Sequence, residues 1–226
     1  LLDHQADLLS ERKGDEVGER IIETVRALRV TSGEVKAIGV SVPGIANKHT
    51  GKVWAPNIPA WDEYPLQLRL QEASGISVAV DNDRTCSILG ECWRGNAKGS
   101  SDAIYLSVGT GIGAGILTSG NIVRGAHDIA GAIGWMALDR PYQTKYKPVG
   151  CFEYHASGDG IARIALEVLQ KEKEYKGPLR LARPEDLTAH KVFTAFNDGD
   201  VVALKVIDEC IGFWGMASAN LVSLFN

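Results

Sequence analysis

Apolar runs of strand length alternate with amphipathic helical stretches in the first hundred residues, and this alternation constrains the fold most. The run from Val35 to Val42 reads as a buried strand that ends at Pro43 and Gly44, and residues 76–80 read as a second strand. Residues 15–30 and 64–75 instead carry apolar side chains at helical spacing. The alternation predicts an α/β fold, with helices on the faces of a sheet and functional loops at the carboxyl ends of strands.

The pattern changes after Asp102, where strand-like runs follow one another directly. Two apolar runs, Ile104–Val108 and Gly113–Leu117, flank a glycine-rich turn at residues 109–111, and a second turn at 119–121 reverses the chain again. This pattern predicts a meander of strands that opens a second sheet.

The remaining residues are mostly helical in pattern, and their last segment begins near Asp200. In it, apolar residues recur at three- and four-residue spacing and predict one buried face, formed by Leu204, Ile207, Ile211 and Trp214. A small polar stretch at residues 97–101 marks a domain boundary. We therefore expect an amino-terminal α/β domain at 1–98 and a carboxyl-terminal α/β domain at 99–226.

Composition limits the class of protein. The 226 residues are 45% hydrophobic, enough for a proper core, and 24 basic against 28 acidic residues give a net charge of -4 without a basic cluster. This argues against a nucleic-acid partner. No apolar run approaches the roughly 20 residues of a membrane span, and the first residues are acidic where a signal peptide is basic. We expect a cytoplasmic protein without a membrane partner, whose scattered cysteines are reduced core thiols: Cys86, Cys92, Cys151 and Cys210.

An acidic cluster closes the strand at residues 76–80. Asp81, Asn82 and Asp83 follow it directly, and because unpaired buried charges are costly, such a cluster is either a solvated turn or a working site. Asn82 and Asp83 also suit the N-cap of a helix that begins near Arg84. Both interpretations remain open on the residues alone.

The turn "GTGIGAG" at residues 109–115 has two interpretations as well. A dinucleotide fingerprint requires a helix after its glycines, whereas another strand-like run follows here, and the Lys-Ser/Thr of a P-loop is missing. The remaining choices are a tight β-turn or a hairpin whose exposed N–H groups cradle a phosphate.

The linked motifs "VSVPG", "APNIPAW", "VDNDRTCSILGE", "LSVGTGIGAGIL", "GNIVRGAHDIAGAIG" and "GCFEYHASGDGIAR" resemble the ROK family of repressors, open reading frames and kinases, in order and spacing, from about Val17 onward. The resemblance implies two actin-like (RNase H-like) α/β domains with sugar and ATP in the cleft between them. It also implies transfer of the γ-phosphoryl group from ATP with Mg²⁺ to a hydroxyl of a hexose or amino sugar, and a homodimer.

The resemblance assigns roles to particular residues. Asp83 matches the aspartate that takes the proton from the attacking hydroxyl, with Asn82 beside it on the sugar and Asp81 as a solvated or hydrogen-bonded neighbour. Glu153 matches a glutamate that accepts from two sugar hydroxyls, which would give orientation as well as affinity. The same pocket is implied for Gly44 and Asn57, and a phosphate-binding loop for Gly109, Thr110, Gly111 and Gly113.

Two sugar contacts of the family are missing. Ala132 and Trp135 stand where most members have a glutamate and a histidine. Either the substrate differs from glucose or the site is weakened, unless Trp135 stacks on the sugar. His127 and Asp128 either restore a polar contact or belong to a surface loop.

The family's zinc motif is also incomplete. Its other cysteine positions, counted back from Cys151, hold Thr144 and Tyr146, and its histidine is Trp135. A structural zinc site requires about four nitrogen or sulfur donors, so we predict no zinc. We expect Trp135 and Met136 to fill the place of the metal lobe.

The family's first Asp-x-Gly-Gly-Thr loop and its closing adenosine loop do not occur here. We therefore expect both domains to be incomplete in this chain, the first without its initial strands and the second without its final part. Two functions compete with the kinase: a non-catalytic sugar-sensing effector domain and a pseudokinase. The sequence names neither the sugar nor the state of the altered site at Ala132 and Trp135.

Overall fold

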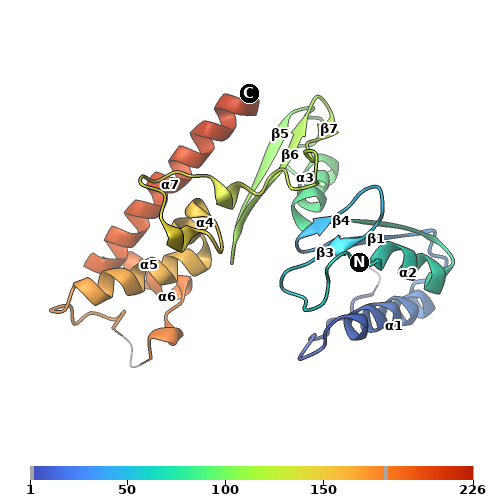
Figure 1. Cartoon of the computed structure of the whole chain (residues 1–226), viewed down its shortest axis with the longest axis horizontal. Coiled ribbons are helices and arrows are strands. Elements are labelled where there is room, and N and C mark those ends of the chain that lie inside the picture. Colours follow the sequence, from blue (N-terminus) through green and yellow to red (C-terminus); the bar gives the residue numbers. More distant parts are fainter. Residues whose placement is uncertain (1–2, 181–182, 226) are drawn as a thin grey trace. The chain divides into compact units, whose positions relative to one another are not determined.

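The computed structural model describes residues 3–180 and 183–225 of the chain. These residues form two compact units, which are drawn in Figure 1. The first unit runs to Asn96 and also includes Arg124–Ala130, and the second comprises Ala97–Val123 and the chain from Gly131 onward. Each unit has a hydrophobic core of its own.

The first unit combines helices with two small sheets. Its helices are α1 (Asp15–Ser32), α2 (Leu66–Ser74) and α3 (Asp83–Arg94), and its strands are β1 (Ala37–Val42), β2 (Ile45–Ala46), β3 (Val53–Trp54) and β4 (Ser77–Asn82). The apolar stripe expected on α1 is confirmed, since Val17 and Ile22 are buried and Ile21, Val25 and Leu28 are half-buried.

The parallel pairing of β1 with β4 fixes the edge from which the functional loops leave. The register runs from Ala37 opposite Ser77 to Val42 opposite Asn82. Because parallel strands point the same way, the loop after β1 and the start of α3 emerge from one edge of the sheet. Strands β2 and β3 pair antiparallel beside it.

An aromatic pair anchors the core of the first unit. Trp61 and Tyr64 stack with ring centroids 4.5 Å apart and planes 3° from parallel. Trp61 is 2% exposed, and its indole N–H donates to the carbonyl oxygen of Gly14 at 3.0 Å. Both rings belong to the same buried cluster as Leu66 and Leu70 of α2.

The second unit pairs a three-stranded antiparallel sheet with a helical layer. The strands are β5 (Ala103–Val108), β6 (Ile112–Thr118) and β7 (Asn121–Ile122), in the order β5-β6-β7, which confirms the predicted meander. The α-helices are α4 (Cys151–Ala156), α5 (Gly158–Lys171), α6 (Ala189–Asn197) and α7 (Val201–Phe225), and short 3₁₀ turns are η1 (Ile133–Trp135), η2 (Thr144–Tyr146) and η3 (Pro184–Asp186).

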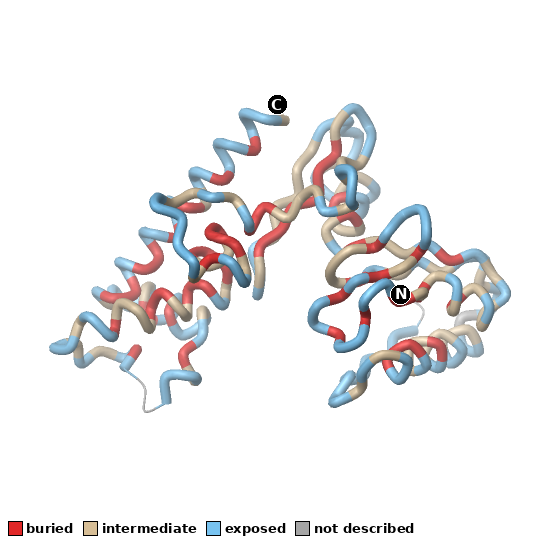
Figure 2. Tube along the Cα trace, viewed as in Figure 1, coloured by how far each residue is buried: buried red, intermediate tan, exposed pale blue. Residues whose placement is uncertain are grey.

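The face of α7 predicted to be buried is partly wrong. Ile207 is buried, but Leu204 and Ile211 are 42% and 53% exposed. The helix is apolar on more than one side, so its spacing fits two faces, and Figure 2 shows buried and exposed residues alternating along it. Packing against α4, α5 and α6 buries one apolar face of the helix: Ala203, Val206, Ile207, Cys210, Phe213, Ala217 and Leu221.

The structure describes the state of the cysteines and the character of the helices. All four cysteines are free thiols; Cys151 and Cys210 are buried, and Cys86 and Cys92 are half-buried. None of the helices in the described ranges combines the length and apolar character needed to cross a lipid bilayer.

Candidate active site

The junction of β4 and α3 uses Asn82 as a helix cap. Asn82 is 4% exposed, and its side-chain oxygen accepts a hydrogen bond from the amide of Thr85 at 2.8 Å, as an N-cap residue does. The capping interpretation therefore holds for Asn82. Its side-chain amide nitrogen donates to no acceptor within the described ranges and stays available to a ligand. The role of Asn82 as a sugar ligand remains a prediction.

Asp83 is the first residue of α3 and lies exposed at the same sheet edge. Its Oδ1 accepts from the amide of Arg84 at 2.8 Å, and the described residues form no ion pair with it. The other oxygen is free to accept a proton or hydrogen bond. The exposed carboxylate at a helix start thus has the accessibility that a general base requires.

Asp81 is held by a cation that the sequence did not indicate. Arg124 donates from Nη1 to Oδ1 at 2.9 Å and from Nη2 to Oδ2 at 2.5 Å, and both side chains are 20% exposed. These hydrogen bonds raise the pKa of Arg124 above its ordinary value. Asp81 is therefore the hydrogen-bonded neighbour that was expected, with a partner that lies 43 positions away.

We predict that Asp81→Asn lowers the free energy of unfolding by about 1–3 kcal/mol, because it leaves Arg124 half-buried without its countercharge. Urea unfolding measures this loss. Glu63→Gln is the matched control, since the Lys52–Glu63 pair is 43% and 79% exposed and should contribute less than about 1 kcal/mol. Equal losses of unfolding free energy in the two variants would contradict a stabilising ion pair between Asp81 and Arg124.

Gly44 makes a close backbone approach at this edge. Its φ is 98°, and an added Cβ would lie 2.2 Å from the carbonyl oxygen of Trp54, so only glycine fits. No pattern in the sequence singled out Arg84, whose Nη2 donates to the Gly44 carbonyl at 3.3 Å and whose buried Nε has no partner in the described part of the chain. Asn57 is exposed in the turn after β3.

In the second unit, Glu153 on α4 contacts the glycine turn. Its Oε2 accepts from the amide of Ile112 at 2.7 Å. A Cβ added to Gly111 would lie 2.7 Å from that oxygen, and one added to Gly134 would lie 3.0 Å from it, so missing side chains make room for the carboxylate. Burial raises the pKa of Glu153, and the hydrogen bond from Ile112 offsets part of the rise.

The glycine turn closes tightly and still keeps free donors. The amide of Gly109 donates to the carbonyl of Gly111 at 2.9 Å, and the Gly109 carbonyl accepts from Gly158 at 2.7 Å. The amides of Thr110 and Gly111 donate to no acceptor in the described residues, so they suit an anion. Gly113 lies buried inside β6, paired with Ser107.

The expectation that Trp135 fills the metal lobe is wrong. Trp135 is 51% exposed, whereas Tyr146, at a former cysteine position, is 0% exposed and packs in the core. Met136 packs partly against that core. The η1 turn points the Trp135 side chain outward, and the larger phenol of Tyr146 occupies the interior instead. No group of three or more His, Cys, Asp or Glu side chains among the described residues is arranged to hold a metal ion.

His127 and Asp128 lie in the segment that packs with the first unit. His127 is exposed and Asp128 is half-buried. Neither side chain forms a hydrogen bond within the described ranges, which agrees with the interpretation as a surface loop.

Comparison with curated proteins finds both kinases and a repressor. The chain is 36% identical over 199 residues to a glucokinase of Halalkalibacterium halodurans, covering 87% of this chain and 60% of that protein. It is 31% identical over 208 residues to the xylose repressor of Caldicellulosiruptor bescii, covering 91% of this chain and 52% of that one. The chain thus spans less than two thirds of either relative.

Solved structures agree with this comparison. A ROK hexokinase from Thermus thermophilus superposes with a TM-score of 0.79 at 29% identity, covering 97% of this chain and 69% of that one. A ROK family glucokinase from Streptomyces griseus, solved with glucose and AMPPNP, gives 0.70 at 26% identity, covering 92% and 69%. The mixed α/β fold is thus the one of these actin-like sugar kinases. Because the ROK family model also matches residues 4–226, the chain belongs to the ROK family.

Proposed function

We propose that the protein is an ATP-dependent sugar kinase that phosphorylates a hydroxyl of a hexose or amino sugar, with Asp83 as the general base. The observation that carries the proposal is the contrast between neighbouring carboxylates. Asp81 is tied to Arg124, whereas Asp83 is exposed and has no cationic partner in the described part of the chain. Of these two carboxylates, Asp83 is the one that is free to accept a proton.

The chemistry needs a base at that point because an alcohol is a weak nucleophile. As the bond between the sugar oxygen and phosphorus forms, the hydroxyl proton moves to a carboxylate oxygen of Asp83, and ADP leaves. Asn82 and Glu153 orient the sugar, with Gly44 and Asn57 lining its pocket. Mg²⁺ bound with ATP supplies neutralisation of the phosphate charge.

In this proposal the backbone N–H groups of the glycine turn donate hydrogen bonds to the phosphates of ATP. The unpaired amides of Thr110 and Gly111 fit an anionic oxygen, and Gly109 leaves open space, since nothing lies within 4 Å of its Cβ position. Gly113 would support the turn from within β6.

We predict that Glu153→Gln weakens sugar binding by about 10- to 100-fold, because a charge-assisted pair of hydrogen bonds becomes a neutral one. The same change alters stability with pH. Since the folded pKa of Glu153 is raised, its contribution is fully present below the unfolded value and is lost as the pH rises through the folded pKa. The variant should therefore gain stability relative to wild type as the pH rises through that window.

Calorimetric titration with sugar and urea unfolding at several pH values measure both effects. Glu172→Gln is the control, because this glutamate pairs with Lys205 at the surface. An unchanged sugar affinity in Glu153→Gln would remove Glu153 from the sugar site, and a pH-independent difference in unfolding free energy would contradict its burial.

A sugar-sensing effector domain is the competing function, because the xylose repressor is a relative. A pseudokinase is the third possibility, since Ala132 and Trp135 replace polar sugar contacts of the family. Incubation of the intact protein with ATP, Mg²⁺ and a sugar panel separates the kinase from the other two. A kinase releases ADP with at least one sugar. A sensor releases none, although one sugar raises its melting temperature.

The proposal includes three properties of the intact protein. These are a cytoplasmic location, a homodimeric state, and sugar and ATP as partners without nucleic acid or membrane.

A further inference from the structure

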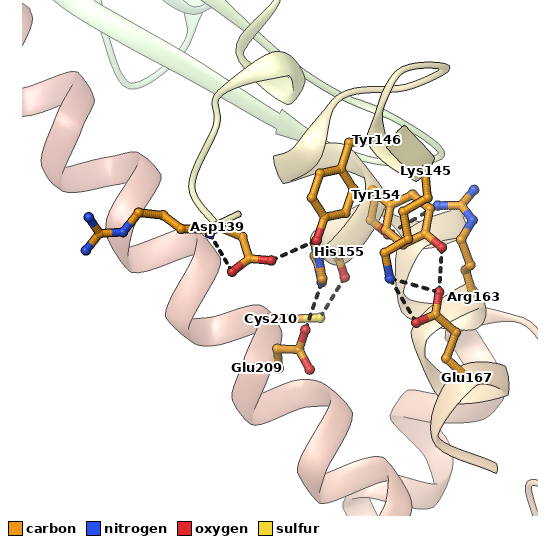
Figure 3. Close-up of polar contacts among 10 residues, drawn as sticks. Asp139, Lys145, Tyr146, Tyr154, His155, Arg163, Glu167, Glu209 and Cys210 are labelled. Atoms are coloured by element: carbon orange, nitrogen blue, oxygen red, sulfur yellow. Dashed lines mark hydrogen bonds and ion pairs between the residues drawn. The ribbon is translucent and has the colours of Figure 1, made fainter. Parts of the chain in front are cut away.

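A network of hydrogen-bonded side chains, with Tyr146 and His155 buried at its centre, occupies the region where the family resemblance implies a metal lobe (Figure 3). The hydroxyl of Tyr146 donates to Oδ2 of Asp139 at 2.7 Å. Nε2 of His155 lies 3.0 Å from the same hydroxyl, and its Nδ1 lies 2.8 Å from Oε1 of Glu209. This hydrogen-bond network therefore links the loop before α4, α4 itself and α7.

Each of the three contacts in this network needs one proton. Tyr146 supplies the proton that goes to Asp139. The two ring nitrogens of His155 contact the phenol oxygen of Tyr146 and the carboxylate of Glu209, so the imidazole bridges the loop before α4 to α7. Burial raises the pKa of Tyr146, so its hydroxyl keeps the proton that it donates.

A second set of contacts holds the other side of α4. The hydroxyl of Tyr154 donates to Oε1 of Glu167 on α5 at 2.5 Å, and Lys145 reaches the other oxygen of that carboxylate at 3.1 Å. The Lys145 ammonium and the Arg163 guanidinium lie 4.7 Å and 4.6 Å from the centroid of the Tyr154 ring. Adjacent residues of α4 thus bind to two different helices.

Three side chains of α7 fix the end of α4. The Cys210 thiol donates to the carbonyl of His155 at 3.3 Å, and the Trp214 indole N–H donates to the carbonyl of Ala156 at 3.0 Å. The rings of His155 and Phe213 stack with centroids 4.4 Å apart. Because α4 has only six residues, these contacts determine where its first turn lies.

Glu153 lies in that first turn, next to Tyr154 and His155. We propose that the hydrogen-bond network of Tyr146 and His155 takes the place of a metal in this protein, and that these two positioning residues aim the Glu153 carboxylate at the amide of Ile112. Trp135 and Thr144 offer no zinc donor, and the Tyr146 hydroxyl is already occupied by Asp139 and His155. The consequence for sugar binding rests on the proposed function.

Hydrogen exchange of the Ile112 amide, followed by NMR in the intact protein, tests the positioning without sugar or nucleotide. Tyr146→Phe keeps the ring and removes the hydroxyl, so it should speed this exchange by about tenfold. The Val192 amide of α6, which donates to the carbonyl of Thr188, should keep nearly the same exchange rate. Tyr175→Phe is the matched control, since its hydroxyl donates to Asp200 at 2.7 Å elsewhere in the unit and should leave Ile112 unchanged.

A separate experiment tests whether the protein holds a metal. Treatment of the wild-type protein with EDTA or phenanthroline should leave the Ile112 exchange rate unchanged, and elemental analysis should find no stoichiometric zinc. Faster exchange after chelation, or bound zinc, would overturn the proposal. An unchanged exchange rate of the Ile112 amide in Tyr146→Phe would also overturn it. So would an equal increase in the exchange rates of the Ile112 and Val192 amides. If Tyr146→Phe does not fold, His155→Gln provides the same comparison. Because every readout is independent of turnover, an inactive protein leaves this test decisive.

Discussion

Asp83→Asn is expected to lower kcat for sugar phosphorylation by about 10²- to 10⁴-fold, with little change in sugar affinity. An amide of the same shape keeps the contacts at the start of α3 but accepts no proton from the attacking hydroxyl. The Asp83 side chain is exposed and accepts one hydrogen bond, from the amide of Arg84, so its replacement should leave the fold intact. Steady-state ADP release gives kcat, and calorimetry gives the affinity for the sugar.

Asp62→Asn is the control for this prediction. Asp62 is an exposed carboxylate of the same unit, and its replacement changes the net charge by the same amount. We expect its kcat to match wild type. If Asp83→Asn also retains the wild-type kcat, Asp83 is not the base. If it loses sugar binding together with activity, Asp83 acts as a binding residue instead.

Gly150→Ala is expected to destabilise the protein by about 3–5 kcal/mol, the largest stability effect in the chain that we predict. Gly150 precedes α4 with φ 90° and ψ 155°, a conformation that is essentially restricted to glycine. An added Cβ would lie 2.3 Å from the carbonyl oxygen of Gly134 and 2.6 Å from Cα of Trp135, and both are backbone atoms that cannot rotate away. Urea unfolding of the variant measures the loss.

Gly212→Ala is the matched control. Gly212 lies exposed within α7, and nothing is within 4 Å of its Cβ position, so alanine should stabilise the helix by about 0.5–1 kcal/mol. A loss below about 1 kcal/mol in Gly150→Ala would contradict the close packing of α4 on the η1 turn. A loss in Gly212→Ala similar to that in Gly150→Ala would point to a general intolerance of the added methyl group.

Local patterns predicted the elements of this fold well because their causes are local. The helix at α1 follows from apolar side chains at helical spacing, and the β5-β6 hairpin follows from two apolar runs around glycines. The face of α7 did not follow, because Leu204 and Ile211 are as apolar as the residues that became buried. Its choice depends on α4, α5 and α6, which the spacing within α7 does not encode.

The site shows the same limit. Residues at the junction of β4 and α3 were identifiable because Asp81, Asn82 and Asp83 follow one another in the chain. The partner of Asp81 was not, since Arg124 arrives from a distant segment. The outward position of Trp135 and the buried hydrogen bonds of Tyr146 also depend on contacts with other elements, which residue identity alone does not specify.

We propose that this protein moves a phosphoryl group from ATP to a sugar hydroxyl. The most direct measurement is a ³¹P NMR time course of the intact wild-type protein with ATP, Mg²⁺ and each sugar that raises its melting temperature. We expect the γ-phosphate signal of ATP to decline as a sugar phosphomonoester and ADP appear together. ATP that stays intact with every sugar that binds would contradict it and favour a sugar sensor.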